Sequence, residues 1–155
     1  MKSSVYLDTT IFSYYVDQRN ELLVHILRTK EWWDKERQLY DLYISNFILL
    51  ELQEGKFPEQ QQALNLTKNI NILEPLDEID KVVEIYIKNK LMPKHDLRDA
   101  LHLAFASVYK IDFLLTWNCS HLANINKIGH IRNMNLSLGL FIPTIITPLE
   151  LRIEE

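Results

Sequence analysis

Glycine is scarce in this sequence, since three of its 155 residues are glycine. Disordered and low-complexity chains have a different composition, and the apolar fraction of 47% is ordinary for a globular protein. Neither glycine-rich phosphate-binding pattern, G-x-x-x-x-G-K or G-x-G-x-x-G, occurs in the chain. The sequence therefore predicts a folded domain that does not bind nucleotides through either of these loops.

Cysteine and long apolar segments are also nearly absent. The one cysteine, Cys119, excludes an internal disulfide and fits a reducing compartment. No apolar run approaches the roughly 20 residues that a membrane helix needs, and the N-terminus lacks the apolar core of a signal peptide. We therefore expect a cytoplasmic protein without a membrane partner.

An excess of positive charge is missing as well. The formal net charge is −4, which provides no general attraction to nucleic acid. A nucleic-acid enzyme with this charge would need a local basic patch or bound metal ions to approach its substrate.

Short apolar segments alternate with segments of helical periodicity. The predicted strands cover residues 4–7, 42–44, 70–73, 113–118 and 144–147. The predicted helices cover residues 11–16, 21–39, 47–54, 58–68, 78–91, 96–108, 120–125 and 128–138. Such alternation is typical of βαβ units. We expect a single domain over residues 1–155, an α/β fold of the three-layer α/β/α sandwich type with a central parallel sheet of four to five strands.

The helix predicted after residue 96 is apolar on nearly every side. Its sequence begins D-L-R-D-A-L-H-L-A-F-A. A helix that is apolar all round is buried, so Asp99, in the first turn, begins a buried helix. Carboxylates are almost never buried without a partner. This acid therefore indicates a functional site.

Four polar side chains are expected at one edge of the sheet. Asp8 follows the first strand and Asn118 the fourth, Glu51 lies about one helical turn beyond the second, and Asp99 begins the helix that leads into the fourth. Clustered carboxylates repel one another unless they are protonated or bridged by cations. Hard cations such as Mg²⁺ or Mn²⁺ bind such oxygens, and two of them can clamp a phosphodiester.

Each of these residues also has a simpler explanation. Asp8 could serve only as a helix N-cap. Asp96 and Asp99 fit a capping box, and the capping role is favoured for Asp96. The capping role is favoured for Asn118 too, because asparagine is a poor metal ligand. Glu51 is the hardest to explain in this way, because a glutamate on an apolar helical face costs stability without a partner.

Basic residues accompany the buried helix. Lys94 and Arg98 could attract an RNA phosphate, or Arg98 could pair with a carboxylate of the pocket, which is more common in metal-free structures. His102 follows Asp99 by three residues and could touch the pocket. A hydrogen-bonded structural histidine is, however, the more frequent case.

Four segments of the chain form an ordered set: V-Y-L-D-T-T from Val5, I-S-N-F-I-L-L-E-L from Ile44, R-D-A-L-H-L-A-F-A from Arg98 and F-L-L-T-W-N from Phe113. This set resembles the PIN domain, the fold of VapC-type toxins and related ribonucleases, over about residues 5–148. The resemblance implies a Mg²⁺- or Mn²⁺-dependent ribonuclease with an acidic pocket. It also implies the toxin half of a bacterial toxin–antitoxin pair.

The resemblance carries over residue by residue. Asp8, Glu51 and Asp99 match the expected acids, and Thr9 and Thr116 match the hydroxyl residues that often accompany the site. We expect Asp8 and Asp99 to be the principal metal ligands, and Glu51 to ligate or to orient the attacking water. The two threonines would hydrogen-bond the carboxylates or metal-bound waters.

Asn118 departs from the family pattern, which usually has an aspartate there. Its amide oxygen could still ligate a cation or hold a bridging water, and Asp96 could supply the missing charge. Three functions therefore stay open. The first is an endoribonuclease toxin neutralised by an antitoxin protein, the second a non-catalytic PIN-like module that binds RNA or protein through a degenerate site, and the third a nuclease outside any toxin system. Homodimers are common in the resembling family.

Overall fold

A parallel five-stranded sheet forms the centre of the computed structural model, which describes residues 1–92 and 97–152. The strands are β1 (Ser4–Leu7), β2 (Asp41–Ser45), β3 (Asn71–Leu73), β4 (Phe113–Leu115) and β5 (Thr144–Ile146). Their order is β3-β2-β1-β4-β5, and each neighbouring pair is parallel. The predicted α/β fold with a parallel sheet is thereby confirmed, with five strands.

Strand β1 is central because its side chains are apolar on both faces, and residues 5–7 are fully buried. Leu7 lies opposite Leu115 of β4, and the backbone N–H of Asp8 donates to the Leu115 carbonyl at 3.1 Å. The order of strands reverses between β1 and β4, which is where ligands bind in sheets of this kind. Asp8 and Thr116, the residues that follow these strands, therefore lie at the expected ligand-binding edge.

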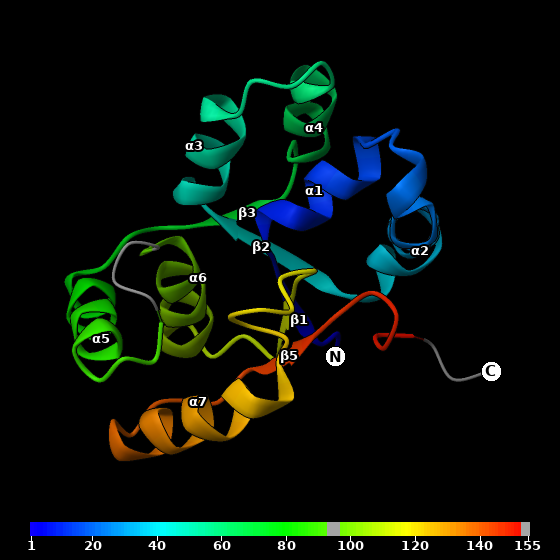
Figure 1. The fold of residues 1–155 in the computed structure, drawn as a ribbon. Coiled ribbons are helices and arrows are strands. Elements are labelled where there is room, and N and C mark those ends of the chain that lie inside the picture. The colour runs from blue at the N-terminus through cyan, green and yellow to red at the C-terminus, as the bar shows by residue number, and fades with distance from the viewer. Residues whose placement is uncertain (93–96, 153–155) are drawn as a thin grey trace.

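Helices cover both faces of the sheet. They are α1 (Thr9–Val16), α2 (Leu23–Glu31), α3 (Asn46–Glu54), α4 (Gln60–Leu66), α5 (Asp77–Lys88), α6 (Leu97–Val108) and α7 (Ile125–Ser137). Figure 1 shows α1 to α4 gathered on one side of the sheet, and α5, α6 and α7 on the other. Eight of the twelve residues of α6 are buried, as its apolar sequence predicts. Among the described residues, no helix has the length and apolar character needed to cross a membrane.

Two predicted helices differ from the structure. The helix predicted over 21–39 is divided, since α2 continues through one π-helical and one 3₁₀ turn. The helix predicted over 120–125 is wrong, because this segment forms turns. The side-chain oxygen of Asn118 accepts the backbone N–H groups of Ser120 and His121, which bends the chain away from a helix, and Asn124 then caps α7.

A buried polar group joins the helices of one face. The hydroxyl of Tyr86 on α5 donates to Oδ1 of Asn135 on α7 at 2.6 Å. The amide of Asn135 donates to Oγ of Ser107 on α6 at 2.9 Å and to the Phe141 carbonyl at 3.0 Å. Burial raises the pKa of Tyr86 to about 12, so its hydroxyl remains a donor at neutral pH.

A buried arginine on α2, Arg28, forms an ion pair with the turn that follows α2 and hydrogen bonds with the C-terminal segment. A terminal nitrogen of Arg28 lies 2.9 Å from a carboxylate oxygen of Glu36, and their side chains are 5% and 10% exposed. Nε of Arg28 also donates to the Pro148 carbonyl at 2.6 Å. Arg28 therefore links the helical layer to the segment that follows β5.

Candidate active site

Asp8 is held at the junction of β1 and α1. Its side chain is almost fully buried. The backbone N–H of Thr9 donates to Oδ1 at 2.6 Å, and the hydroxyls of Thr10 and Thr116 donate to Oδ2. Thr116 follows β4, so Asp8 is fixed in one orientation by groups from both sides of the switch point.

Glu51 lies on α3 and faces Asp8 across a buried imidazole. The hydroxyl of Thr9 donates to Oε2 of Glu51 at 2.9 Å. Nε2 of His102 lies 2.6 Å from Oε1 of Glu51 and 3.8 Å from Oδ1 of Asp8. One histidine nitrogen thus lies close to two carboxylates that are 43 positions apart in the sequence.

The other ring nitrogen of His102 is bonded to a chain of two hydroxyls. Nδ1 of His102 lies 2.7 Å from the hydroxyl of Tyr6, which lies 2.7 Å from Oγ of Ser45. All three side chains are buried. The chain Ser45–Tyr6–His102–Glu51 therefore runs from the end of β2 through β1 and α6 to α3.

The pair of Glu51 and His102 is stabilised in its charged form. Burial alone would lower the pKa of His102, but the hydrogen bond to Glu51 and the charges of Asp8, Glu51 and Asp99 outweigh burial and raise it. Burial alone would raise the pKa of Glu51, but the hydrogen bond and charge of His102 lower it, with smaller contributions from Thr9 and Arg98. The imidazolium therefore offsets part of the negative charge in this pocket.

The start of α6 brings a third acid and an arginine. Asp99 is in the first turn and is 7% exposed, and its negative charge acts on His102. Arg98 lines the same cavity as Asp99 and lowers the pKa of Glu51. The predicted residues Lys94 and Asp96 lie outside the described residues.

Asn118 uses its side-chain oxygen within its own turn. Oδ1 accepts the backbone N–H groups of Ser120 and His121, each at 3.1 Å. The backbone N–H of Asn118 donates to Oγ1 of Thr116 at 2.9 Å. Two lone pairs of an amide oxygen are thereby used, so the part of Asn118 that remains for a ligand is the NH₂ group, a donor.

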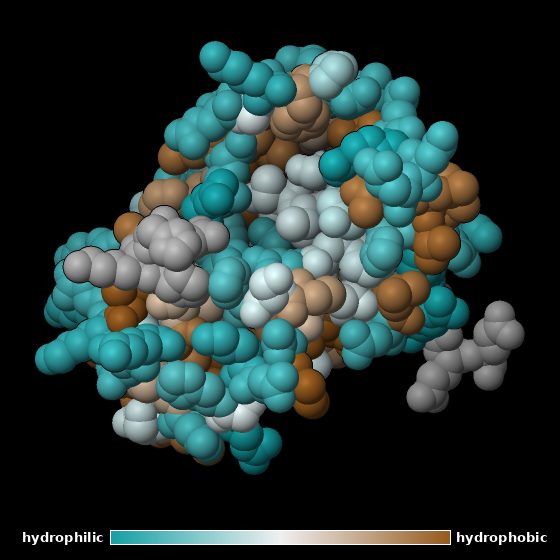
Figure 2. Space-filling model, viewed as in Figure 1, coloured by the Kyte–Doolittle hydropathy of each residue, from teal (hydrophilic) through white to brown (hydrophobic). Residues whose placement is uncertain are grey.

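These side chains line one cavity of about 250 Å³, whose walls are formed by Asp8, Thr9, Thr10, Ser13, Glu51, Arg98, Asp99 and Asn118. The cavity lies at the carboxyl ends of β1 and β4, as expected for such a sheet. Figure 2 shows this face of the molecule hollowed near its centre, where residues of low hydropathy line the depression. The structure thus brings together six of the predicted residues: Asp8, Thr9, Glu51, Arg98, Asp99 and Asn118.

The donor set of this cavity suits a hard divalent cation. Asp8, Glu51 and Asp99 offer carboxylate oxygens, the ligands that Mg²⁺ and Mn²⁺ prefer. In the described part of the chain, no three His, Cys, Asp or Glu side chains are already placed as a complete metal site. Mg²⁺ keeps several waters and commonly takes one or two carboxylates together with substrate phosphates, so a complete site is not required.

Sequence reasoning missed several members of the site. The hydroxyl of Thr10 donates to Asp8 and accepts the backbone N–H of Trp117 at 2.9 Å. Tyr6 and Ser45 were not predicted, and His102 was expected to be structural rather than to touch two acids. A polar residue inside the apolar strand β1 was the available signal for Tyr6.

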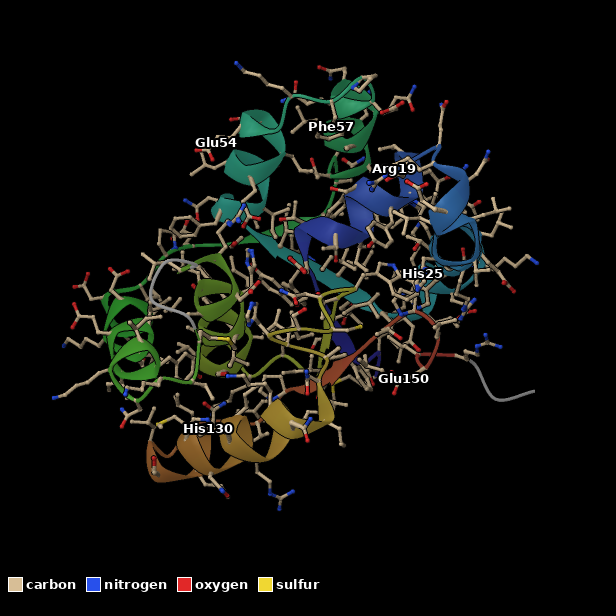
Figure 3. All side chains as sticks on the ribbon, viewed as in Figure 1. Arg19, His25, Glu54, Phe57, His130 and Glu150 are labelled. Atoms are coloured by element: carbon tan, nitrogen blue, oxygen red, sulfur yellow. The ribbon has the colours of Figure 1, made fainter. Side chains whose placement is uncertain are left out.

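A larger cavity of about 570 Å³ lies beside the acidic one, and Ser13 lines both. Its walls come from the C-terminal end of α1 with the residues that follow it, 17–19, and from the connection between α3 and α4. Figure 3 labels Arg19 and Phe57, which lie on these two segments near the top of the view. Two acids, Asp17 and Glu59, line the larger cavity, but the three acids predicted for the site, Asp8, Glu51 and Asp99, line the smaller one.

The sequence profile of the PIN domain family matches residues 5–118, which is more than half of the chain. This chain belongs to the PIN domain family. The match begins in β1 and ends at Asn118, so it includes every residue predicted for the acidic pocket of this PIN domain. No match was found among curated protein sequences.

Solved structures share the fold of this PIN domain. A toxin–antitoxin complex from Klebsiella pneumoniae aligns with 94% of this chain and 98% of its own, at 20% identity and a TM-score of 0.58. VapC20 of Mycobacterium tuberculosis, a sarcin–ricin-loop-cleaving toxin, aligns with 76% of this chain and 92% of its own, at 10% identity and a TM-score of 0.59. VapBC2 of Rickettsia felis, bound to a promoter DNA fragment, aligns with 92% and 97% at 18% identity and a TM-score of 0.53.

Proposed function

We propose that this PIN domain is a divalent-metal-dependent endoribonuclease that hydrolyses RNA phosphodiester bonds. The observation that carries the proposal is the single cavity at the switch point that Asp8, Glu51 and Asp99 line together. Membership of the PIN family and the likeness to a toxin that cleaves the sarcin–ricin loop of RNA support it.

Asp8 and Asp99 would hold the metal, Mg²⁺ or Mn²⁺, and Glu51 would ligate it or orient the attacking water. When bound, such an ion supplies an activated water and offsets the charge of the phosphodiester. Thr9, Thr10 and Thr116 keep the carboxylates in place as hydrogen-bond donors. Asp96 stays in the proposal as a weaker metal ligand, whereas Asn118 would contribute only its NH₂ group, as a hydrogen-bond donor, unless its oxygen left the turn.

Substrate and partners follow from the same reasoning. Arg98 lines the cavity and would attract the RNA phosphate, together with Lys94. The likeness to toxin–antitoxin complexes supports the toxin of a type II pair, with an antitoxin protein as partner. A homodimer stays a proposal that rests on the family resemblance alone. We place it in the cytoplasm.

Asp8→Asn should abolish Mn²⁺-dependent cleavage of RNA while leaving the fold intact, because the amide has the shape of the carboxylate but not its charge. The measurement is the cleavage rate of a labelled single-stranded RNA, with circular dichroism as the check on folding. Asp80→Asn, the same change on an exposed position of α5, should cleave at the wild-type rate. Undiminished cleavage by Asp8→Asn would remove Asp8 from the mechanism.

A second candidate function is a non-catalytic module that binds RNA or protein. It is favoured by one observation, the oxygen of Asn118, which is engaged in its own turn where the family usually has an aspartate. Metal titration separates the two functions, because Mn²⁺ at 100 times its Kd stabilises a protein by about 2.7 kcal/mol. A melting temperature that does not respond to Mn²⁺, together with absent cleavage, would favour the module.

A further inference from the structure

A cluster of basic residues lies beside the acidic cavity. Lys88 and Lys90 at the end of α5, Lys127 at the start of α7 and His121 between them line a cavity of about 520 Å³. Ile87, Met92 and Ser120 complete the described lining, which contains no carboxylate. This local charge contrasts with the net charge of −4 for the whole chain.

The basic cavity and the acidic cavity share one wall, the turn from Asn118 to His121. Asn118 lines the acidic cavity, whereas Ser120 and His121 line the basic one. The two N–H bonds to Oδ1 of Asn118 hold this turn. The Cα atoms of residues three positions apart in a turn lie within about 7 Å of each other. An RNA chain bound in one cavity can therefore extend directly into the other.

The ammonium of Lys127 is positioned by the fold. It donates to the Leu91 carbonyl at 2.8 Å, and an ammonium has further N–H groups for a second acceptor. Lys88 and Lys90 are exposed and can adapt to a ligand. Lys90 has a positive φ of 58°, a conformation typical of the residue that ends a helix, here α5.

We propose that this basic cavity binds the phosphate backbone of the RNA next to the phosphate held in the acidic cavity. The inference rests on the proposed nuclease function and assigns a subsite to it. Lysines are point charges that bind phosphates without reading the base, so the subsite would hold single-stranded RNA regardless of sequence. It would supply the local attraction that the acidic chain otherwise lacks.

The test measures binding of a short fluorescent single-stranded RNA in EDTA at several salt concentrations, so that neither metal nor cleavage is involved. Lys88→Gln/Lys90→Gln should weaken binding roughly fivefold to tenfold and make the plot of log Kd against log salt shallower by about 1.4, or about 0.7 for each lysine removed. Lys2→Gln/Lys68→Gln is the matched control, because these lysines precede β1 and β3 at the opposite edge of the sheet. The control should bind like the wild type.

Several outcomes would overturn the subsite. Unchanged binding by Lys88→Gln/Lys90→Gln would do so, and so would an equal loss in the control pair, which would indicate a general effect of charge. Binding of an oligoglutamate peptide as tightly as RNA would indicate an acidic protein partner instead.

Cleavage in Mn²⁺ separates this inference from the proposed function. Lys88→Gln/Lys90→Gln should raise KM and leave kcat unchanged, because these residues bind substrate and do not touch the reacting atoms. If the wild-type protein bound RNA through the basic cavity but did not cleave RNA in Mn²⁺, the nuclease proposal would be contradicted and the subsite supported.

Discussion

Asn118 differs from an aspartate in what it can offer to a ligand. Its oxygen is engaged with the N–H groups of Ser120 and His121, so the cavity receives an amide donor. An aspartate could accept the same two bonds with one oxygen and direct the other towards a metal ion. The substitution therefore changes the charge of the cavity without requiring a different turn.

Asn118→Asp should tighten Mn²⁺ binding by roughly tenfold, because the ligand charge of the site increases. Without metal, the extra carboxylate should lower the melting temperature, since it repels Asp8 and Asp99. Both changes can be followed by thermal unfolding with and without Mn²⁺. Asn133→Asp, the same change at an exposed position of α7, should alter neither value.

His102 makes the stability of the metal-free protein depend on pH. Its pKa is raised above 6.5, so its stabilising contribution is complete below pH 6.5 and is lost as the pH rises through the raised value. The pKa of Glu51 is lowered below 4.5, so its contribution is complete above pH 4.5 and is lost as the pH falls through the lowered value. The pair contributes most between these limits.

His102→Gln should remove this dependence, because glutamine does not titrate. The melting temperature of the wild type in EDTA should exceed that of His102→Gln most between pH 4.5 and 6.5, and the difference should shrink as the pH rises further. His130→Gln, an exposed change on α7, serves as the control. A difference that does not shrink as the pH rises above 6.5 would contradict the charged pair.

At the level of elements, α5, α6 and α7 depend on one shared polar contact. Asn135 accepts from Tyr86 and donates to Ser107 and to the chain after α7. A buried polar group that loses one partner costs free energy, because no water replaces the lost bond. The site depends on this contact indirectly, since α6 carries both Asp99 and His102.

Tyr86→Phe should therefore lower the free energy of unfolding by about 1–3 kcal/mol, because Oδ1 of Asn135 would lose its donor. Urea denaturation measures the change. Tyr109→Phe removes a bond to the Glu74 carbonyl at an exposed position, and its cost should be smaller. An equal decrease in the free energy of unfolding of the two variants would show that the buried contact stabilises the fold no more than the exposed one.

The elements also show which parts of the fold could be predicted. Strands β1 and β4 are recognisable because they are apolar on both faces, and Asp8 stands out because it follows one of them. The chain from Ser45 to His102 could not be predicted, because its members are far apart in the sequence and each is unremarkable alone. The turn after β4 was mistaken for a helix because the two bonds to Asn118 cannot be inferred from the sequence.

Across the whole molecule, Arg28 holds the C-terminal segment against the layer of α2. Its partner Glu36 is also buried, so removing either residue would leave the other as an unpaired buried charge. A single buried charge without its partner is more costly than the absence of both.

Arg28→Leu should lower the free energy of unfolding by about 3–5 kcal/mol, because it leaves the carboxylate of Glu36 buried without its partner. Arg28→Leu/Glu36→Leu should recover part of that loss, since no uncompensated charge remains. Chemical denaturation of the two variants gives the comparison. A double variant less stable than the single one would contradict this explanation.

The turn between the two cavities has a practical consequence. Cys119 lies within it, is exposed, and is the sole thiol of the chain. A maleimide fluorophore would therefore attach at this one position without any engineering. Its emission would report directly on occupancy at either flank of the turn, so cation and oligonucleotide titrations could be followed with a single labelled sample.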